Sequence, residues 1–148
     1  MFTFRAMNAD VEVTAYGPDE EAKAAEVAVT FWSAERRFSR FRDDSELSQL
    51  NRSQGRVAVS RELFAALLRA RAYVELTGGI FDPAIGAGLV AHGYDRSFKP
   101  GALDREGKAS LVRVASLSEV ALDAETCTVE RPEHIRIDLG GMIKGWPE

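Results

Sequence analysis

Two hydrophobic periods follow one another along the first part of the chain. Residues 11–16 alternate apolar and polar side chains, which predicts a half-buried β-strand, and residues 3–7 are expected to be its partner. Residues 20–38 carry apolar side chains at spacings of three and four, which predicts an amphipathic helix with Asp19 as its N-cap. The expected apolar face of this helix is Ala24, Val27, Phe31, Ala34 and Phe38.

Shorter patterns follow this helix. Residues 43–45 are expected to open a short helix that runs through Leu50, and residues 57–59 predict a brief strand. Ser60 then caps a third predicted helix, which ends at Gly78 and Gly79. The expected apolar face of the third helix is Leu63, Leu67, Ala70 and Val74.

The remainder of the chain predicts short strands and turns. Residues 120–122, 127–130 and 135–138 have strand patterns, whereas residues 96–109 are polar and rich in Gly and Lys, which predicts a mobile loop. Strands and helices do not alternate as βαβ units, so we expect an α+β fold with a mainly antiparallel sheet and packed helices. A length of 148 residues predicts one domain that spans 1–148.

Composition narrows the class of protein. A net charge of −4 argues against non-specific nucleic-acid binding, which needs an excess of Lys and Arg. The single cysteine, Cys127, has no partner for an internal disulfide, and its place in a predicted strand favours a buried, inert thiol. No apolar run reaches the roughly 18 residues of a membrane span, and the first residues lack the pattern of a signal peptide. The sequence as it stands therefore predicts a cytoplasmic chain.

Residues 135–145 are the most informative segment for function. A predicted strand ends at Asp138, the Gly140–Gly141 pair removes two Cβ atoms, and an apolar stretch with Lys144 can begin a helix. Free N–H groups at a helix start, together with a lysine, favour an anion. A tight packing turn between strand and helix is about as good an interpretation of these residues.

Residues 77–86 form a second candidate segment. Pro83 holds the backbone of Asp82 extended, and Phe81 flanks the carboxylate, an arrangement that suits recognition of the edge of a flat heteroaromatic ring. The alternative is a glycine helix cap followed by an Asp-Pro turn. Local physics alone favours that alternative.

Residues 38–48 combine an aromatic with several charges. Phe41 can stack on the ring of a ligand or can belong to the core. The nearby arginines at positions 36, 37, 40 and 42 can attract phosphates, but they lie among acidic residues, so we expect a solvated surface of mixed charge. We predict no catalytic residue, because His92, His134 and Cys127 assemble into neither a triad nor a zinc motif.

Three motifs in order resemble those of the ApbE family, the FAD:protein FMN transferases once called thiamine-biosynthesis lipoproteins. They are Phe38-Ser-Arg-Phe with Asp44-Ser-Glu-Leu-Ser and Leu50-Asn51, Thr77-Gly-Gly-Ile-Phe-Asp-Pro83, and Asp138-Leu-Gly-Gly-Met-Ile-Lys-Gly145. The resemblance runs from about Phe4 to Trp146. It implies the N-terminal portion of such a protein, because family members continue well past this point.

The resemblance implies an enzyme that depends on Mg²⁺ and uses FAD as its substrate. The FMN half of FAD would pass to a Thr or Ser hydroxyl of an acceptor protein, and AMP would be released. By the same resemblance the FAD-binding residues are Met7, Phe41, Ile80, Phe81, Asp82, Asp138 and Lys144, and Gly141 offers a metal ligand through its carbonyl. Where the family has Met-Gly-Thr, this chain has Met7-Asn8-Ala9.

Family members supply further metal ligands, an Asp and a Thr, from beyond this sequence. We therefore expect the chain to bind FAD but not to turn over alone. The alternatives are a non-catalytic FAD-binding module and a purely structural α+β domain. Apolar side chains at Met142, Ile143 and Trp146 favour a homodimer. For full-length relatives the resemblance leaves a membrane-anchored lipoprotein form open.

Overall fold

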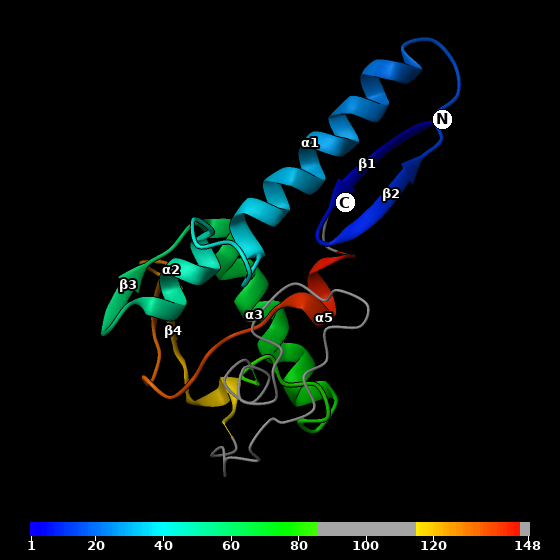
Figure 1. Ribbon diagram of the computed structural model, residues 1–148. Coiled ribbons are helices and arrows are strands. Elements are labelled where there is room, and N and C mark those ends of the chain that lie inside the picture. Colours follow the sequence, from blue (N-terminus) through cyan, green and yellow to red (C-terminus); the bar gives the residue numbers. More distant parts are fainter. Residues whose placement is uncertain (86–114, 146–148) are drawn as a thin grey trace, which may run out of the picture.

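The computed structural model describes residues 1–85 and 115–145. Two regions are distinguishable in Figure 1. An arm is formed by the long helix α1 (Glu20–Phe38) and the hairpin of β1 (Phe2–Ala6) and β2 (Ala9–Val13). A body contains the other helices and a second small sheet. The two regions meet at the C-terminal end of α1.

The hairpin closes through a two-residue turn. Ala6 pairs with Ala9, so Met7 and Asn8 are the loop, and their φ angles of 52° and 60° are both left-handed. This is the geometry of a type I′ turn, in which Asn is well tolerated. The indole N–H of Trp32 on α1 donates to the carbonyl of Arg5 at 3.1 Å and fixes the hairpin against the helix.

Helix α1 has the predicted bounds. Ala24, Ala34 and Phe38 are buried as predicted, whereas Val27 is exposed because α1 projects beyond the body. Asp19 is the N-cap residue, but the predicted side-chain cap is wrong: its φ is 64°, and its carboxylate makes no cap hydrogen bond. Its carbonyl instead accepts from the N–H of Lys23 at 3.0 Å.

Two shorter helices pack in the body. Helix α2 (Glu46–Arg52) begins after Ser45 and runs two residues past the predicted end, and α3 (Arg61–Leu76) begins after Ser60. Both serine side chains accept from the backbone N–H three residues on, as expected of N-caps. The predicted face of α3 is confirmed, because the four residues Leu63, Leu67, Ala70 and Val74 are buried.

The body sheet has three strands in the order β3–β5–β4, and both pairs are antiparallel. The strands are β3 (Arg56–Ala58), β4 (Ala121–Asp123) and β5 (Thr128–Glu130), and the 3₁₀ helix η1 (Leu117–Glu119) precedes β4. The α+β class is confirmed. The strand prediction for Cys127 is wrong, since this half-buried residue lies in the β4–β5 turn with φ 49°.

Residues 135–138 are extended but form no named strand, which corrects the prediction. A single parallel bridge joins Arg136 to Ile85. The amide of Asn51 takes the place of a neighbouring strand: its Nδ2 donates to the carbonyl of Ile137 at 2.8 Å and its Oδ1 accepts from the Ile137 N–H at 2.9 Å. The segment leads into the one-turn helix α5 (Gly140–Ile143).

A buried arginine ties this segment to α2. Arg131 is 8% exposed and donates to carbonyls at the end of α2, including Leu50 at 3.0 Å, and to the carbonyl of Ile135 at 2.7 Å. Burial, with a smaller contribution from Arg136, lowers the pKa of this guanidinium. The core around it is aliphatic. Its most enclosed side chains include Leu47, Leu50, Leu63, Leu67, Leu117, Ile135, Ile137 and Leu139.

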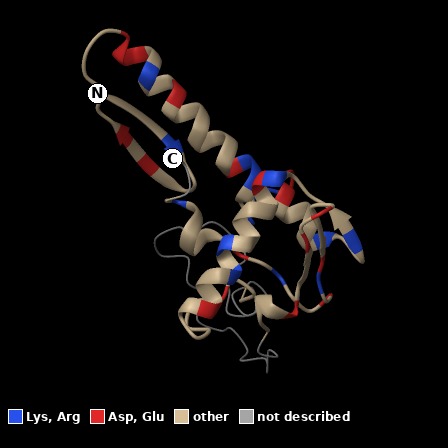
Figure 2. Cartoon of the chain, turned by 180° about the vertical axis from the view of Figure 1, so that it is seen from behind, with Lys and Arg blue, Asp and Glu red and all other residues tan. Residues whose placement is uncertain are grey.

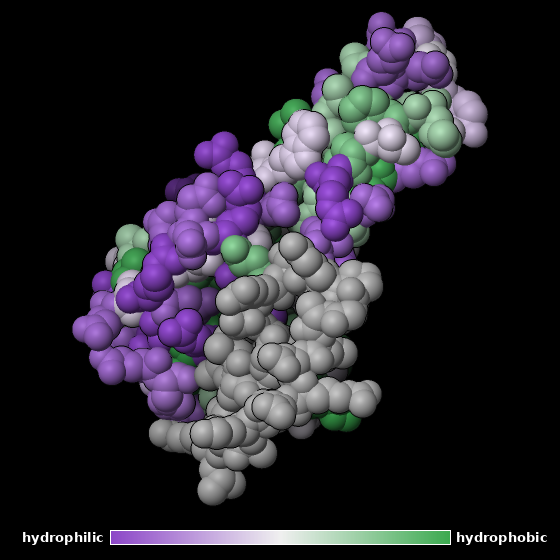
Figure 3. All heavy atoms as spheres, viewed as in Figure 1, coloured by the Kyte–Doolittle hydropathy of each residue, from purple (hydrophilic) through white to green (hydrophobic). Residues whose placement is uncertain are grey.

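The two regions differ at the surface. Acidic and basic side chains alternate around the junction of α1 with the body (Figure 2), whereas apolar residues gather on the arm (Figure 3). Among the described residues, no helix is both long and apolar enough to span a bilayer. The predicted loop at 96–109, His92 and Trp146 lie outside the described residues.

Candidate functional site

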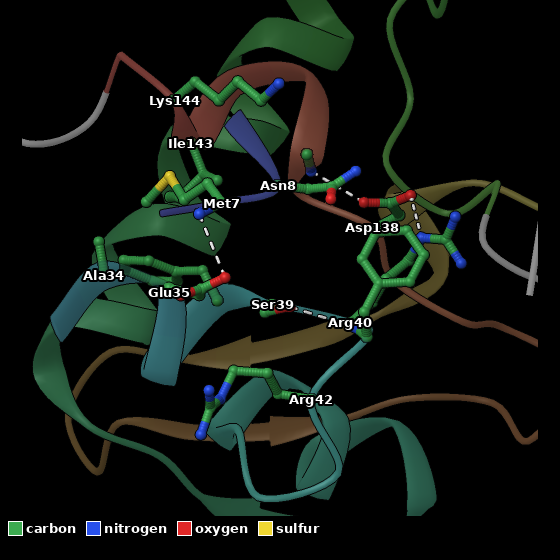
Figure 4. Close-up of a pocket in the computed structure, with 13 residues that line it drawn as sticks. Met7, Asn8, Ala34, Glu35, Ser39, Arg40, Arg42, Asp138, Ile143 and Lys144 are labelled. Carbon is green, nitrogen blue, oxygen red and sulfur yellow. Dashed lines mark hydrogen bonds and ion pairs between the residues drawn. The ribbon is translucent and has the colours of Figure 1, made fainter. Parts of the chain in front are cut away.

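A cleft of about 320 Å³ opens where the hairpin turn, the end of α1 and helix α5 meet (Figure 4). Three segments distant in sequence therefore contribute to one site. The residues that line it are Met7, Asn8, Ala34, Glu35, Phe38, Ser39, Arg40, Phe41, Arg42, Asp138, Gly140, Ile143 and Lys144.

The hairpin turn is fixed at the cleft by a carboxylate of α1. Oε1 of Glu35 accepts from the backbone N–H of Met7 at 3.1 Å (Figure 4). This contact joins the left-handed turn to the last part of α1. Asn8 adopts the conformation that glycine would provide, so the change from the Gly of the family motif is compatible with the turn.

The segment after α1 is held by serine hydroxyls. Ser45 and Ser48 of the α2 region both donate to the carbonyl of Ser39, the latter at 3.2 Å. The N–H of Phe41 donates to Oγ of Ser39 at 3.2 Å. Because these bonds fix the backbone at 39–41, they also fix where Arg40 and Phe41 emerge from the turn.

Phe41 is a cleft residue and not a core residue. Its side chain is 43% exposed, and the guanidinium carbon of Arg40 lies 4.0 Å from the ring centroid. A cation at this distance interacts favourably with the ring face. The sequence left stacking and core roles open, and the exposure favours the first.

Asp138 is engaged by two different donors. Its Oδ2 lies 2.6 Å from Nε of Arg40, and its Oδ1 accepts from the Gly140 N–H at 2.8 Å (Figure 4). The side chains of Arg40 and Asp138 are only 12% and 16% exposed. A charge pair so shielded from water interacts more strongly than an exposed pair. The backbone N–H of Asp138 also donates to the Pro83 carbonyl at 2.8 Å.

The prediction of a solvated arginine cluster is correct for Arg42 and wrong for Arg40. Arg42 is exposed and donates to both carboxylate oxygens of Asp44, at 3.0 and 2.9 Å. That hydrogen bonding raises the pKa of Arg42 and lowers the pKa of Asp44. Arg40 instead turns toward Asp138, because the serine contacts at 39–41 orient it inward.

At the start of α5 the structure differs from the predicted anion site. The helix has one turn, and its first N–H, that of Gly140, is already bonded to Asp138. Lys144 is exposed at the other end of this turn, as the C-cap. Ile143, one of the apolar side chains expected to favour a homodimer, is buried against the core.

The second candidate segment packs behind the cleft. A Cβ at Gly141 would lie 3.2 Å from Cε2 of Phe81, so the ring and the glycine are in close contact. Oδ1 of Asp82 accepts from the N–H groups of Ala84 at 2.9 Å and Leu117 at 3.0 Å. Ile80 is 93% exposed. The ligand-binding roles of these residues stay predictions.

The structure thus gathers part of the predicted set. Met7, Phe41, Asp138 and Lys144 line one cleft, whereas Ile80, Phe81, Asp82 and Gly141 do not line it. Sequence reasoning missed Arg40, Glu35 and Asn8 as lining residues. A signal for Arg40 existed in its place beside Phe41, but only the fold brings it to Asp138.

A Mg²⁺ ion is not accommodated by these residues alone. Among residues 1–85 and 115–145, no group of three or more His, Cys, Asp or Glu side chains could hold a metal. Asp138, the carboxylate nearest the motif, already contacts Arg40 and Gly140. Mg²⁺ at this cleft would need oxygen ligands from a bound phosphate or from other residues.

Comparison with known proteins gives the family context. The model of the ApbE family matches residues 7–147. A curated FAD:protein FMN transferase from Treponema pallidum (strain Nichols) is 33% identical over an alignment that covers 92% of this chain and 40% of that protein.

Solved structures agree on the fold. The ApbE protein of Thermotoga maritima MSB8 superposes with a TM-score of 0.84 at 23% identity, over 99% of this chain and 48% of that one. The flavin transferase ApbE of Vibrio cholerae gives a TM-score of 0.77 at 19% identity, over 99% and 49%. The chain spans about half the length of these structures, and less of the curated relative.

Proposed function

The chain belongs to the ApbE family, and from this premise we propose that its cleft binds FAD for the transfer of FMN to a protein. The acceptor would be a Thr or Ser hydroxyl. Its oxygen forms a new bond to the phosphorus of the FMN half, the phosphoanhydride bond to the AMP half breaks, and AMP leaves with the bridging oxygen. The hydroxyl proton passes to a base that we do not assign among the described residues.

The observation that carries the proposal is the pairing of Arg40 and Asp138 beside Phe41 in a cleft that Lys144 also lines. The aromatic ring suits stacking with a flat ligand, and the cationic side chains suit a diphosphate. A fixed cation near the phosphates would also stabilise charge that develops during phosphoryl transfer. FAD combines a flat ring with a diphosphate.

Dependence on Mg²⁺ is also part of the proposal. The described residues offer no ready set of ligands, so the metal would bind chiefly through FAD phosphates, with the Gly141 carbonyl as the contact that the family resemblance implies. Bound Mg²⁺ would supply charge neutralisation at the phosphates. Chelation with EDTA should therefore abolish transfer.

FAD binding is the first test. Titration of flavin fluorescence with the protein should show saturable binding that Phe41→Ala and Lys144→Ala both weaken. Phe41→Ala removes stacking area and Lys144→Ala removes a charge, so high salt should weaken binding to Phe41→Ala more than to Lys144→Ala. Unchanged FAD affinity in both variants would show that FAD does not bind at this cleft.

Transfer is tested with FAD, Mg²⁺ and a threonine-bearing acceptor peptide. The proposed reaction gives equal amounts of AMP and FMN-modified peptide, both measurable by mass spectrometry. An acceptor with Ala in place of Thr is the control. AMP release without peptide modification would indicate hydrolysis in place of transfer.

A second candidate is a non-catalytic FAD-binding module. It is favoured by the lack of a three-ligand metal cluster within the described part of the chain. It predicts FAD affinity that Mg²⁺ leaves unchanged and no AMP at any time. A homodimer and a cytoplasmic location stay predictions, which sizing chromatography and cell fractionation would test.

A further inference from the structure

We propose that Arg40 is a diphosphate-binding residue of the cleft and that Asp138 is the positioning residue that holds it there. The inference rests on the proposed binding of FAD. It assigns a role to an arginine that is not among the FAD-binding residues implied by the family resemblance, and it changes the expected role of Asp138 from contact with the ligand to orientation of a cation.

The geometry of Arg40 supports this role. The side chain is 12% exposed, lies over the ring of Phe41 at 4.0 Å and contacts Asp138 through Nε at 2.6 Å. A guanidinium presents its N–H donors in a rigid planar fork, a geometry that matches the oxygens of a phosphate. An arginine fixed on two sides also loses little rotamer freedom on binding a phosphate.

The contacts of Asp138 point to a holding role. One oxygen accepts from the backbone N–H of Gly140 and the other lies in an ion pair with Arg40, so both contact groups of the protein. A bare carboxylate beside a diphosphate would repel it. With Arg40 between them, the negative charge of Asp138 orients a cation and does not face the ligand.

The backbone makes the arrangement specific to Arg40. The carbonyl of Ser39 accepts from the hydroxyls of Ser45 and Ser48, and Ser39 Oγ accepts from the N–H of Phe41. These contacts bracket Arg40 on both sides in sequence. Arg42, two residues on, instead pairs with Asp44 at the exposed surface. One turn therefore pairs one arginine with the shielded Asp138 and the other with the exposed Asp44.

A pair of flavins separates phosphate recognition from ring recognition. FAD carries the diphosphate, and riboflavin carries the same ring without any phosphate. We expect Arg40→Gln to lower FAD affinity by roughly ten- to a hundredfold while riboflavin affinity stays within twofold. Arg40→Lys keeps a point charge without the fork and should recover part of the FAD affinity.

Asp138→Asn tests the holding role. It should weaken FAD binding several-fold and leave riboflavin binding unchanged, and it should have little further effect in the Arg40→Gln background. Arg56→Gln is the matched control, because the exposed Arg56 pairs with Asp123 on the body sheet and lies outside the cleft. That variant should bind both flavins as the wild type does.

The outcomes distinguish the two proposals. If the wild type binds neither flavin, FAD binding at this cleft is wrong. If the wild type binds FAD and Arg40→Gln binds it equally well, the role of Arg40 is wrong and FAD binding stands. Equal loss of FAD and riboflavin in both Arg40 variants, with a lowered Tm, would assign Arg40 to the fold of the cleft and overturn its role toward phosphate.

Discussion

Two glycine pairs occur in this chain, and they serve different physical needs. Gly78 and Gly79 end α3 with φ angles of 61° and 84°, and a Cβ at either would meet nothing within 4 Å. Gly140 and Gly141 have no left-handed φ, but a Cβ would lie 3.0 Å from Asp138 and 3.2 Å from Phe81 respectively. The first pair needs conformational freedom, whereas at the second pair an added side chain would come close to a neighbouring side chain.

The aspartates beside the two pairs differ in the same way. Asp82 accepts from two backbone N–H groups, of Ala84 and Leu117, and so joins two parts of the fold. Asp138 accepts from one backbone N–H and pairs with the side chain of Arg40 in the cleft. A carboxylate bonded only to backbone stabilises the fold, whereas one paired with a cation that lines the cleft can take part in binding.

The largest effect on stability is expected at the first pair. The N–H groups of Gly78 and Gly79 donate to the carbonyls of Glu75 at 3.2 Å and Val74 at 2.8 Å, the bonds of a Schellman motif. Ala in a left-handed conformation costs about 1–2 kcal/mol per residue. We expect Gly78→Ala/Gly79→Ala to lose about 2–4 kcal/mol, measured by urea denaturation.

The matched variant for this prediction is Gly78→Asn/Gly79→Asn. Asn adopts the left-handed region more readily than Ala, so the loss should be smaller although the side chain is larger. Equal losses for Ala and Asn would mean that steric contact, not φ, decides the requirement at Gly78 and Gly79.

The second largest effect on stability is expected at Asp82. Asp82→Asn keeps one acceptor oxygen but removes the charge that strengthens the bonds from Ala84 and Leu117. We expect a loss of about 1–2 kcal/mol in the free energy of unfolding. Asp138→Asn, compared in the same denaturation experiment, should lose less, because Asp138 has one backbone donor. A larger loss for Asp138→Asn would reverse the assignment of the two carboxylates.

The same segments show which structural features the sequence could predict. The period of α3, its Ser60 cap and its glycine end are all local properties, and each prediction is confirmed. Residues 135–138 also have a local strand pattern, but no strand forms there. The side chain of Asn51, 86 residues away in sequence from Ile137, supplies the backbone partners instead.

The site also combines features that are local in sequence with features that depend on long-range contacts. Phe41 and Asp138 could be singled out because motifs contain them, and the cleft brings both together. Arg40 lies in the first motif too, but its shielding from water could not be predicted, because it depends on hydroxyl contacts from Ser45 and Ser48 and on a carboxylate almost one hundred positions away. The sequence places these groups far apart, and only tertiary structure decides which arginine of the cluster is shielded from water.

An intermediate effect, on binding more than on stability, is expected from Gly140→Ala. The new Cβ would lie 3.0 Å from Oδ1 of Asp138, so the carboxylate must shift and its bond to Arg40 weakens. Ala also gains about 0.5–1 kcal/mol over Gly in a helix, which offsets much of the loss in stability. FAD affinity should fall about three- to tenfold, the loss of about one hydrogen bond. Unchanged FAD affinity with unchanged Tm would show that Asp138 can move without effect.

The smallest effect on stability is expected from Gly141→Ala. This variant gives the sharpest test of the difference between the two glycine pairs. The Cβ would lie 3.2 Å from the edge of the half-buried Phe81 ring, which packs edge-on against Tyr73 at 6.1 Å between centroids. A displacement of a few tenths of an ångström by the ring is enough, and helix propensity again favours Ala. Stability should therefore change by about 0.5 kcal/mol or less. Its urea denaturation is compared with that of the Gly78→Ala/Gly79→Ala variant. If Gly141→Ala lowers the free energy of unfolding as much as that variant does, the ring of Phe81 is held rigidly. The segments 77–83 and 138–145 would then act as one packed unit, and the difference between the two glycine pairs would be one of degree.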